Sequence, residues 1–336
     1  MSRSRPKVFV PNQIPEQALR YLQEHCEVDY RDAEEKLSDA ELIAGLQDAE
    51  GLMIYSRQKI EASILEHAPR LKVISNIAVG YDNLDLAELT KRGIMGTNTP
   101  GVLTETTADL TFSILMAAAR RIAEADHFVK SGQWEGWKPS LLLGKNVYGS
   151  TLGIIGMGRI GEAVARRAKG FDMNILYYNR SRKPDAEAGL GVIYTSMDEL
   201  LQKSDYVVVL VPLGPSSTRL IGEREFHLMK RDAIFINVSR GATVDEQALI
   251  RALQEGRIAG AALDVFEKEP VDKNNPLLQM RNVVTVPHIG SATLETRSKM
   301  AEKAARNLVA GLSGQIPVDL INPEVIPSAS SQKKWG

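Results

Sequence analysis

The sequence predicts an α/β protein with two domains, each made of a mostly parallel sheet flanked by helices. Two observations indicate this fold class. Short apolar runs of the β type alternate with helix-type stretches, and the alternation starts twice, first near Lys7 and again near Thr151. Such βαβα order favours parallel sheets covered by helices. The length of 336 residues, 43% of them hydrophobic, is sufficient for two domains with separate cores.

The first series consists of the apolar runs KVFVP, GLMIYS and KVISNIAVG, which alternate with the helix-type stretches PEQALRYLQEH and SDAELIAGLQDA. The last stretch opens with Ser38 and Glu41 at the spacing of a capping box. We therefore expect a helix to begin just after Ser38.

The second series follows a long helical stretch from about Thr104 to Lys130 and the loop-like segment SGQWEGWKPSLLLGKN. Ser196 and Glu199 repeat the capping spacing before another helix. Apolar runs predict six strands in this series, at 151–155, 174–178, 206–212, 233–238, 258–266 and 283–287.

A further helix, from about Thr293 to Gly311, comes after the second series is complete and is too long to be a loop. We infer that it returns to the first domain, which is then discontinuous. The expected boundaries are 1–100 plus 290–336 for one domain and 101–289 for the other. The polar segment 328–336, SASSQKKWG, is predicted to be a frayed tail.

Composition argues against several classes of partner. A formal net charge of -1 and a pI near 6.6 provide no field that attracts nucleic acid or an anionic membrane. Cys26 is the only cysteine, so it forms no intrachain disulfide and is expected to be a small core residue in a reducing compartment. No secretory h-region and no run of membrane-spanning length is present, which predicts a cytoplasmic protein.

The stretch Gly156-Met157-Gly158-Arg159-Ile160-Gly161 follows an apolar strand and opens a helix. This is the context of a dinucleotide-binding loop, where glycines make the turn, admit the pyrophosphate and allow close helix packing. The pyrophosphate would bind the exposed N–H groups at the helix N-terminus. The alternative is a glycine-rich turn without a ligand.

The acidic residue expected about 20 positions after such a loop is missing. Asn179 stands there, 18 residues after Gly161, and is followed by Arg180, Ser181 and Arg182. A carboxylate would repel the 2'-phosphate of NADP(H), whereas these residues offer hydrogen bonds worth about 1.5–3 kcal/mol each. NADP(H) is therefore expected over NAD(H), which remains possible. The alternative interpretation is a solvated charge run at a strand end.

His288 differs from the other four histidines, which lie in or beside amphipathic helical stretches. It directly follows a predicted strand, between Pro287 and the flexible Ile-Gly of VVTVPHIGSAT. Ligand sites of open α/β sheets gather at such strand ends. Reduction of a carbonyl needs a general acid, and histidine titrates in a suitable range.

Two other strand-end loops carry charge. Arg240 follows the strand AIFINVS, and Glu269 ends the stretch ALDVFEKEP. A guanidinium group binds a carboxylate in a bidentate fork and polarises a carbonyl, the two groups that a 2-oxo acid presents. A glutamate beside His288 would orient its ring. Each residue alone is more often solvated, and only their joint placement favours catalysis.

These motifs carry a resemblance. The segments AVGYDN (78–83), GIIGMGRIG, INVSRG, ALDVFEKEP and PHIGSAT resemble the D-isomer-specific 2-hydroxyacid dehydrogenase family, most closely its glyoxylate/hydroxypyruvate reductase branch. The resemblance covers nearly the whole chain. It implies two Rossmann-like domains with a deep interdomain cleft, a discontinuous flavodoxin-like substrate-binding domain and a mid-chain NAD(P)-binding domain.

The resemblance also implies roles for single residues. Arg240 would bind and polarise the substrate, His288 would be the acid/base, and Glu269 its partner. The substrate-binding residues would be Tyr55, Ser56, Val79, Gly80, Arg240 and His288, with the backbone N–H groups of Val79 and Gly80 on the carboxylate. The cofactor-binding residues would be Thr107, Gly156, Gly158, Arg159, Ile160, Gly161, Asn179, Arg180, Ser181, Val211, Pro212, Val238, Asp264, His288 and Gly290, with Asp264 on the nicotinamide carboxamide.

Family members are typically homodimers, with the segment around Trp134 and Trp137 reaching toward the partner. Trp137 would line the neighbour's pocket, or would be an interface aromatic without substrate contact. Ala78 stands where phosphite dehydrogenases have lysine, so phosphite is not an expected substrate. Tyr55, Ser56 and the following arginine make the pocket-forming stretch more polar than in glyoxylate reductases generally.

The first hypothesis is therefore an NADPH-preferring reductase of glyoxylate and hydroxypyruvate, which yields D-2-hydroxy acids. A 2-ketogluconate reductase of the same family is the second, because of the polar pocket stretch. A nucleotide-sensing, corepressor-like scaffold is the third. The chain has no GxSxG, no Walker A loop and no HExxH, so hydrolysis, phosphoryl transfer and a zinc site are not expected.

Overall fold

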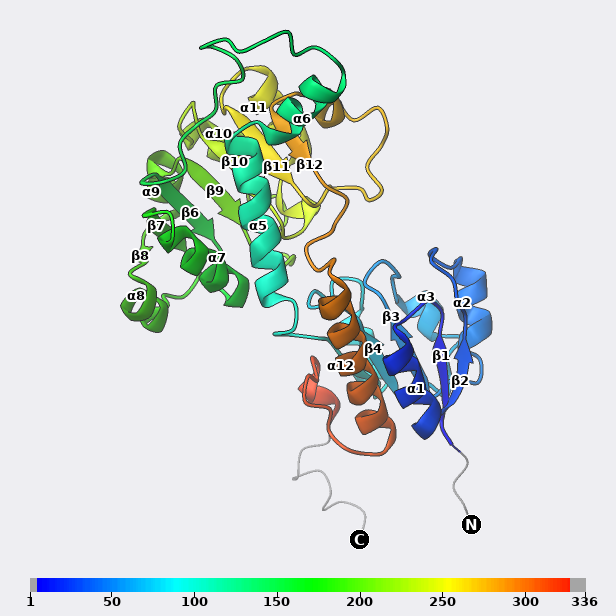
Figure 1. Cartoon of the computed structure of the whole chain (residues 1–336). Helices are drawn as coiled ribbons and strands as arrows, with labels where there is room; N and C mark the ends of the chain where they lie inside the picture. The colour runs from blue at the N-terminus through cyan, green and yellow to red at the C-terminus, as the bar shows by residue number, and fades with distance from the viewer. Residues whose placement is uncertain (1–4, 327–336) are drawn as a thin grey trace. The chain divides into compact units, whose positions relative to one another are not determined.

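The computed structural model describes residues 5–326 and confirms the predicted fold class (Figure 1). The segment 328–336, predicted as a frayed tail, lies outside the described residues. The chain divides into two compact units: Met1–Leu103 with Ala292–Gly336 form unit 1, and Thr104–Ser291 form unit 2. None of the helices between residues 5 and 326 combines the length and apolar character that a membrane crossing requires.

Unit 1 is a five-stranded parallel sheet covered on both faces. The strands, in spatial order, are β2 (Glu27–Tyr30), β1 (Lys7–Val10), β3 (Gly51–Ile54), β4 (Val73–Asn76) and β5 (Met95–Thr97). One face packs against α1 (Glu16–His25) and α12 (Leu294–Leu312), and the other against α2 (Asp39–Leu46), α3 (Ala62–Leu65) and α4 (Leu86–Lys91). The helix predicted near the C-terminus is thus α12, which completes the core of unit 1.

Unit 2 is a seven-stranded parallel sheet, also covered on both faces. Its strands, in spatial order, are β12 (Val283–Thr285), β11 (Gly260–Leu263), β10 (Ile234–Asn237), β9 (Tyr206–Val209), β6 (Thr151–Ile155), β7 (Asn174–Tyr178) and β8 (Ile193–Tyr194). On one face lie α5 (Thr104–Ala119), α7 (Arg159–Lys169) and α8 (Pro184–Leu190). On the other lie α9 (Met197–Lys203), α10 (Glu223–Leu228) and α11 (Glu246–Gln254).

The sequence located most elements of unit 2, but it missed the short strand β8 and not all of the limits agree. All six predicted strands are present, although four of them end earlier than the apolar runs suggest. The predicted helix from Thr104 to Lys130 is wrong as a single element: it breaks into α5 and α6 (Ile122–Lys130), because Arg121 adopts a left-handed φ of 52°. Helical periodicity continues across this break, so the pattern alone does not reveal it.

The two predicted capping spacings behave differently. At Ser38 the capping box is complete, with the Ser38 N–H bonded to Glu41 Oε2 at 2.9 Å and the Glu41 N–H to Ser38 Oγ at 3.4 Å. At Ser196 the hydroxyl caps the Glu199 N–H at 3.2 Å, but the Glu199 carboxylate binds the side chains of Thr195 and Lys203 instead.

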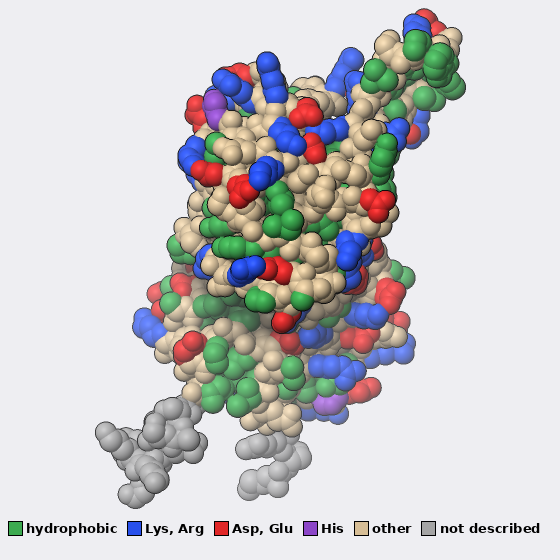
Figure 2. All heavy atoms as spheres, turned by 90° about the vertical axis from the view of Figure 1, so that its left-hand side faces the viewer, with side chains coloured by type: hydrophobic (Ala, Val, Ile, Leu, Met, Phe, Trp, Pro, Cys, Tyr) green, Lys and Arg blue, Asp and Glu red, His purple; other side chains and the backbone are tan. Residues whose placement is uncertain are grey.

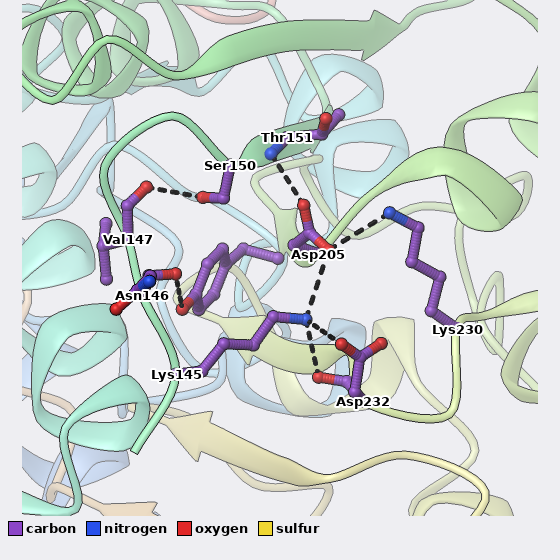
Figure 3. A network of polar contacts seen from close by, with 9 residues as sticks. Lys145, Asn146, Val147, Ser150, Thr151, Asp205, Lys230 and Asp232 are labelled. Carbon is purple, nitrogen blue, oxygen red and sulfur yellow. Dashed lines mark hydrogen bonds and ion pairs between the residues drawn. The ribbon is translucent and has the colours of Figure 1, made fainter.

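Charged residues brace the amino ends of the central strands of unit 2 (Figure 3). Asp205 accepts hydrogen bonds from the Thr151 N–H at 2.8 Å, Lys145 at 3.2 Å and Lys230 at 3.1 Å. Lys145 also pairs with Asp232 at 2.8 Å. Burial opposes ionisation of Asp205, but these donors outweigh it and lower its pKa. The network holds β6, β9 and β10 together at the edge opposite to their carboxyl ends.

Candidate active site

Three glycines shape the loop after β6, which the sequence predicts to bind a pyrophosphate. Gly156 has φ +107°, and a Cβ there would lie 2.8 Å from the Leu210 carbonyl carbon. A Cβ on Gly161 would lie 2.4 Å from the Gly156 oxygen, so this glycine allows α7 to start close to the sheet. By contrast, a Cβ on Gly158 would meet nothing within 4 Å. The first and third glycines therefore serve the fold, while the second borders open space.

The N-terminus of α7 is suited to an anion. Among the described residues, the backbone N–H groups of Gly158, Arg159, Ile160 and Gly161 have no acceptor, and no side chain caps this helix. Unsatisfied N–H groups and the helix dipole together favour negative charge at this position. The residues present therefore fit the pyrophosphate of a dinucleotide.

Asn179, at the end of β7, is bonded to the glycine loop. Its Oδ1 accepts a hydrogen bond from the Met157 N–H at 2.8 Å, and its Nδ2 donates to the Met157 oxygen at 3.3 Å. The two arginines that follow, Arg180 and Arg182, differ in their ion pairs. Arg182 binds Glu187 through a bidentate contact, with Nη2 at 2.7 Å and Nε at 2.8 Å. The exposed Arg180 has no ion pair within residues 5–326.

Arg240 follows β10 in a turn that Asn237 organises. The buried Asn237 side chain donates to the Arg240 oxygen at 3.1 Å and accepts from the Ser239 N–H at 3.0 Å. These bonds hold the backbone of Ser239 and Arg240, so the arginine extends from a braced turn. Asn237 was not singled out from the sequence, since its partners become apparent only when the turn is formed.

His288 and Glu269 form a direct pair. Nδ1 of His288 lies 2.7 Å from Glu269 Oε2, and the Phe266 N–H donates to Glu269 Oε1 at 3.1 Å. Burial raises the pKa of Glu269, but the hydrogen bond and charge of His288, the Phe266 N–H and the Arg240 charge lower it overall, below its ordinary value. Glu269 is therefore a carboxylate that can stabilise a protonated imidazole.

Asp264 holds the His288 loop. Its carboxylate accepts from the Ile289 N–H at 2.6 Å and the Gly290 N–H at 3.0 Å, and its backbone oxygen accepts from the His288 N–H at 2.9 Å. His288 itself has a left-handed φ of 52°, which these bonds stabilise. Burial raises the pKa of Asp264 to about 6 despite the two N–H donors and the charge of His288.

The remaining candidates of unit 2 border the same edge of the sheet. Val211 and Pro212 follow β9, and Val238 follows β10. Thr107, buried in the first turns of α5, lies beside Gly290. Because all seven strands are parallel, their carboxyl ends share one edge, where β6 has β9 on one side and β7 on the other. Ligands of doubly wound sheets bind at such a switch point.

The candidates of unit 1 also follow strand ends. Tyr55 and Ser56 come after β3, and the Tyr55 hydroxyl donates to the Gln13 oxygen at 3.2 Å. Val79 and Gly80 follow β4, and their N–H groups have no acceptor within residues 5–326. All four residues therefore lie at the carboxyl edge of the five-stranded sheet.

Comparisons with known proteins show to which family the chain is related. Residues 112–290 match the family described as D-isomer specific 2-hydroxyacid dehydrogenase, NAD binding domain. A glyoxylate reductase from Korarchaeum cryptofilum is 52% identical over 96% of this chain and 97% of its own.

Two solved structures are similar over nearly the whole chain. A protein from Thermus thermophilus is 43% identical, has a TM-score of 0.88, and covers 94% of this chain and 99% of its own. An NADPH-dependent glyoxylate/hydroxypyruvate reductase from Sinorhizobium meliloti, in complex with NADP and malonate, is 34% identical, has a TM-score of 0.86, and covers 97% and 99%.

A Rossmann-like sheet with an uncapped helix N-terminus and an imidazole–carboxylate pair at the same edge is typical of oxidoreductases that use a nicotinamide cofactor. The chain belongs to the D-isomer specific 2-hydroxyacid dehydrogenase family, in its glyoxylate reductase branch, and is an oxidoreductase.

Proposed function

We propose that this protein reduces small 2-oxo acids, glyoxylate and hydroxypyruvate among them, to D-2-hydroxy acids with NADPH. The observation that carries the proposal is the 2.7 Å contact between His288 and Glu269, at the sheet edge that also holds the uncapped N-terminus of α7. Similarity to proteins named glyoxylate reductase supports the substrate class.

In the proposed reaction, each side chain of the site has a separate role. A bound nicotinamide would supply the hydride that reduces the carbonyl carbon. With Nδ1 of His288 bonded to Glu269, Nε2 is the ring nitrogen left to deliver a proton to the carbonyl oxygen. Glu269 stabilises the protonated ring, and Arg240 polarises the carbonyl while it binds the carboxylate. The N–H groups of Val79 and Gly80, in unit 1, have no acceptor within residues 5–326 and are proposed to bind a substrate carboxylate.

The preference for NADPH rests on the residues at the end of β7. No carboxylate stands at position 179 to repel a 2'-phosphate, and Arg180 is exposed without an ion pair among the described residues. Arg182 is less suited, because Glu187 already neutralises it. One similar structure, the Sinorhizobium meliloti reductase, is described as NADPH-dependent and contains NADP.

We also propose a homodimer that is built on α6 and the loop after it. Helix α6 buries none of its residues within the chain, and Figure 2 shows hydrophobic side chains gathered on the projection at the upper right of that view. Exposed apolar residues of the segment are Ile122, Val129, Trp134, Trp137, Leu143 and Tyr148, with Trp137 82% exposed. Exposed apolar side chains gathered on one segment favour association.

Sedimentation analysis tests the homodimer. The wild type should sediment as a dimer, and replacement of Trp134 and Trp137 by Ser should shift the equilibrium toward monomer.

Steady-state kinetics test the reaction. We expect NADPH oxidation with glyoxylate and hydroxypyruvate, with a higher kcat/KM for NADPH than for NADH. 2-Ketogluconate should be the poorer substrate. Negligible turnover of the first two acids beside efficient turnover of 2-ketogluconate would reject the substrate assignment. Equal efficiencies with the two cofactors would reject the NADPH preference alone.

A further inference from the structure

Three consecutive carbonyl groups in the loop after β4 are held by fixed donors. The Ala78 oxygen accepts from the Thr99 N–H at 2.9 Å, and the Gly80 oxygen from Asn76 Nδ2 at 2.9 Å. Between them, the Val79 oxygen accepts from Asn98 Nδ2 at 2.7 Å, the shortest of the three bonds. The backbone of residues 78–80 is therefore tied on its carbonyl side at every residue.

Tying these carbonyls determines where the neighbouring N–H groups point. In a trans peptide the C=O and N–H lie in one plane and point in opposite directions. The held carbonyl of Ala78 therefore orients the Val79 N–H away from Thr99, and the held carbonyl of Val79 orients the Gly80 N–H away from Asn98. Neither N–H group has an acceptor within residues 5–326. The result is two unsatisfied donors on adjacent peptides with fixed directions, and a carboxylate can accept hydrogen bonds from such donors.

The Ala78 oxygen is held by a backbone N–H, whereas the Val79 oxygen is held by the side chain of Asn98. Substitution of Asn98 can therefore remove the second bond and leave the first. Asn98 is 7% exposed and is itself anchored: its N–H donates to the Asp319 oxygen at 3.3 Å, and its oxygen accepts from Asn307 Nδ2 of α12 at 3.2 Å. Both backbone groups of Asn98 are thus held by the fold, and its buried carboxamide extends from this fixed backbone to the Val79 oxygen.

We propose that Asn98 is a positioning residue for recognition of the substrate carboxylate: its bond to the Val79 oxygen aims the Gly80 N–H at the carboxylate. The proposal rests on the proposed function. Loss of this bond frees the peptide between Val79 and Gly80 to rotate, so that substrate affinity falls while the cofactor site in unit 2 keeps its residues.

The test compares Asn98→Ala with Asn322→Ala as a matched control. Asn322 is also a buried asparagine of unit 1 that braces backbone near the start of β5: its Nδ2 donates to the Ile94 oxygen at 2.9 Å and to Thr90 Oγ1 at 3.1 Å, and its Oδ1 accepts from the Gly96 N–H at 2.8 Å. Three constants are measured for each variant: the KM for glyoxylate, the Ki of oxamate, an unreactive carboxylate analogue, and the Kd of NADPH by fluorescence. Asn98→Asp, which keeps the shape but removes the donor, provides a second variant if Asn98→Ala does not fold.

We expect Asn98→Ala to raise both the glyoxylate KM and the oxamate Ki by about 10- to 100-fold, the range of a hydrogen bond to a charged group. The Kd of NADPH should change less than about twofold, since the cofactor residues lie in unit 2, and Asn322→Ala should leave all three constants near wild type. Equal effects of the two substitutions, or a parallel rise in the Kd of NADPH, would overturn the positioning role. Absence of turnover by the wild type with every 2-oxo acid would instead reject the proposed function, whatever Asn98→Ala does.

Discussion

The side chain of Asn179 pairs with both backbone groups of Met157, accepting from the N–H at 2.8 Å and donating to the oxygen at 3.3 Å. One residue thus connects the end of β7 to the glycine loop after β6. An aspartate is similar in shape but has no N–H to donate. The identity of residue 179 therefore affects both the charge near the adenosine ribose and the rigidity of the phosphate loop.

The substitution Asn179→Asp should change cofactor preference. The carboxylate would repel the 2'-phosphate and lose the bond to the Met157 oxygen, so we expect the KM for NADPH to rise about 10-fold or more. The KM for NADH should change little. Asn174→Asp, an exposed substitution at the opposite end of the same strand, is the control. An unchanged ratio of kcat/KM for the two cofactors would contradict the argument.

Arg180→Gln and Arg182→Gln should separate the two cations. Arg180 has no ion pair among the described residues, so its removal should weaken NADPH binding by about 10-fold, as expected for one charge-assisted bond. Arg182 is already bound to Glu187 at 2.7 Å, and its removal should have a smaller effect on NADPH. Affinity is measured by fluorescence titration with both cofactors. A larger loss of NADPH affinity in Arg182→Gln than in Arg180→Gln would show that the 2'-phosphate contact belongs to Arg182 instead.

Gly158→Ala should affect binding without affecting folding. A Cβ there meets no atom of the protein within 4 Å, and the residue has φ −96°, which alanine readily adopts. We expect the melting temperature to stay near wild type while the affinity for either dinucleotide falls. Gly161→Ala is the counterpart, because its Cβ would lie 2.4 Å from the Gly156 oxygen and should destabilise the fold. Retained dinucleotide affinity in Gly158→Ala would argue against this loop as the pyrophosphate site.

Glu269→Gln should weaken catalysis. The pKa of Glu269 is lowered, so this residue carries a negative charge at neutral pH that can stabilise a protonated ring in the reaction. Without this charge we expect kcat/KM at pH 7 to fall about 10- to 100-fold.

His288→Ala should lower kcat by about 10²- to 10⁴-fold, with NADPH affinity nearly intact. Arg240→Ala should chiefly raise the KM for the oxo acid. Wild-type turnover in His288→Ala would disprove the acid/base role.

Asp205→Asn should destabilise the protein in a pH-dependent way. The pKa of Asp205 is lowered in the folded state, so its contribution to stability is present above the unfolded pKa of about 3.9 and is lost as the pH falls below it. We expect urea unfolding at pH 7 to show a loss of about 2 kcal/mol, within the range for hydrogen bonds to a charged group. The difference in the free energy of unfolding between Asp205→Asn and wild type should become smaller as the pH falls. Asp232→Asn, whose side chain is 70% exposed, should cost less than about 1 kcal/mol. If this difference in the free energy of unfolding did not change with pH, the charge of Asp205 would contribute nothing to stability.

Local pattern was sufficient for the fold class and for the strand ends at which the candidate residues lie, but it missed the short strands β2, β5 and β8. The glycine loop, Arg240, Glu269 and His288 each follow an apolar run, and parallel strands bring such positions to one edge. Pattern was insufficient where backbone conformation departs from periodicity. The left-handed residue Arg121 breaks a predicted helix without any glycine or proline to mark it.

The sequence by itself determined the fold class, the place of the glycine loop between a strand and a helix, and the chemical types at the strand ends, because alternation of apolar runs and turn residues is a local property. Only the tertiary structure decided which polar groups meet. Asn98 contacts Val79 across 19 positions, Met157 contacts Asn179 across 22, and Ile289 contacts Asp264 across 25. Such bonds join the ends of neighbouring strands, and their geometry exists only once the sheet has formed. They hold the loops that carry the candidate site, and for that reason the arrangement of the site belongs to the fold rather than to any single motif.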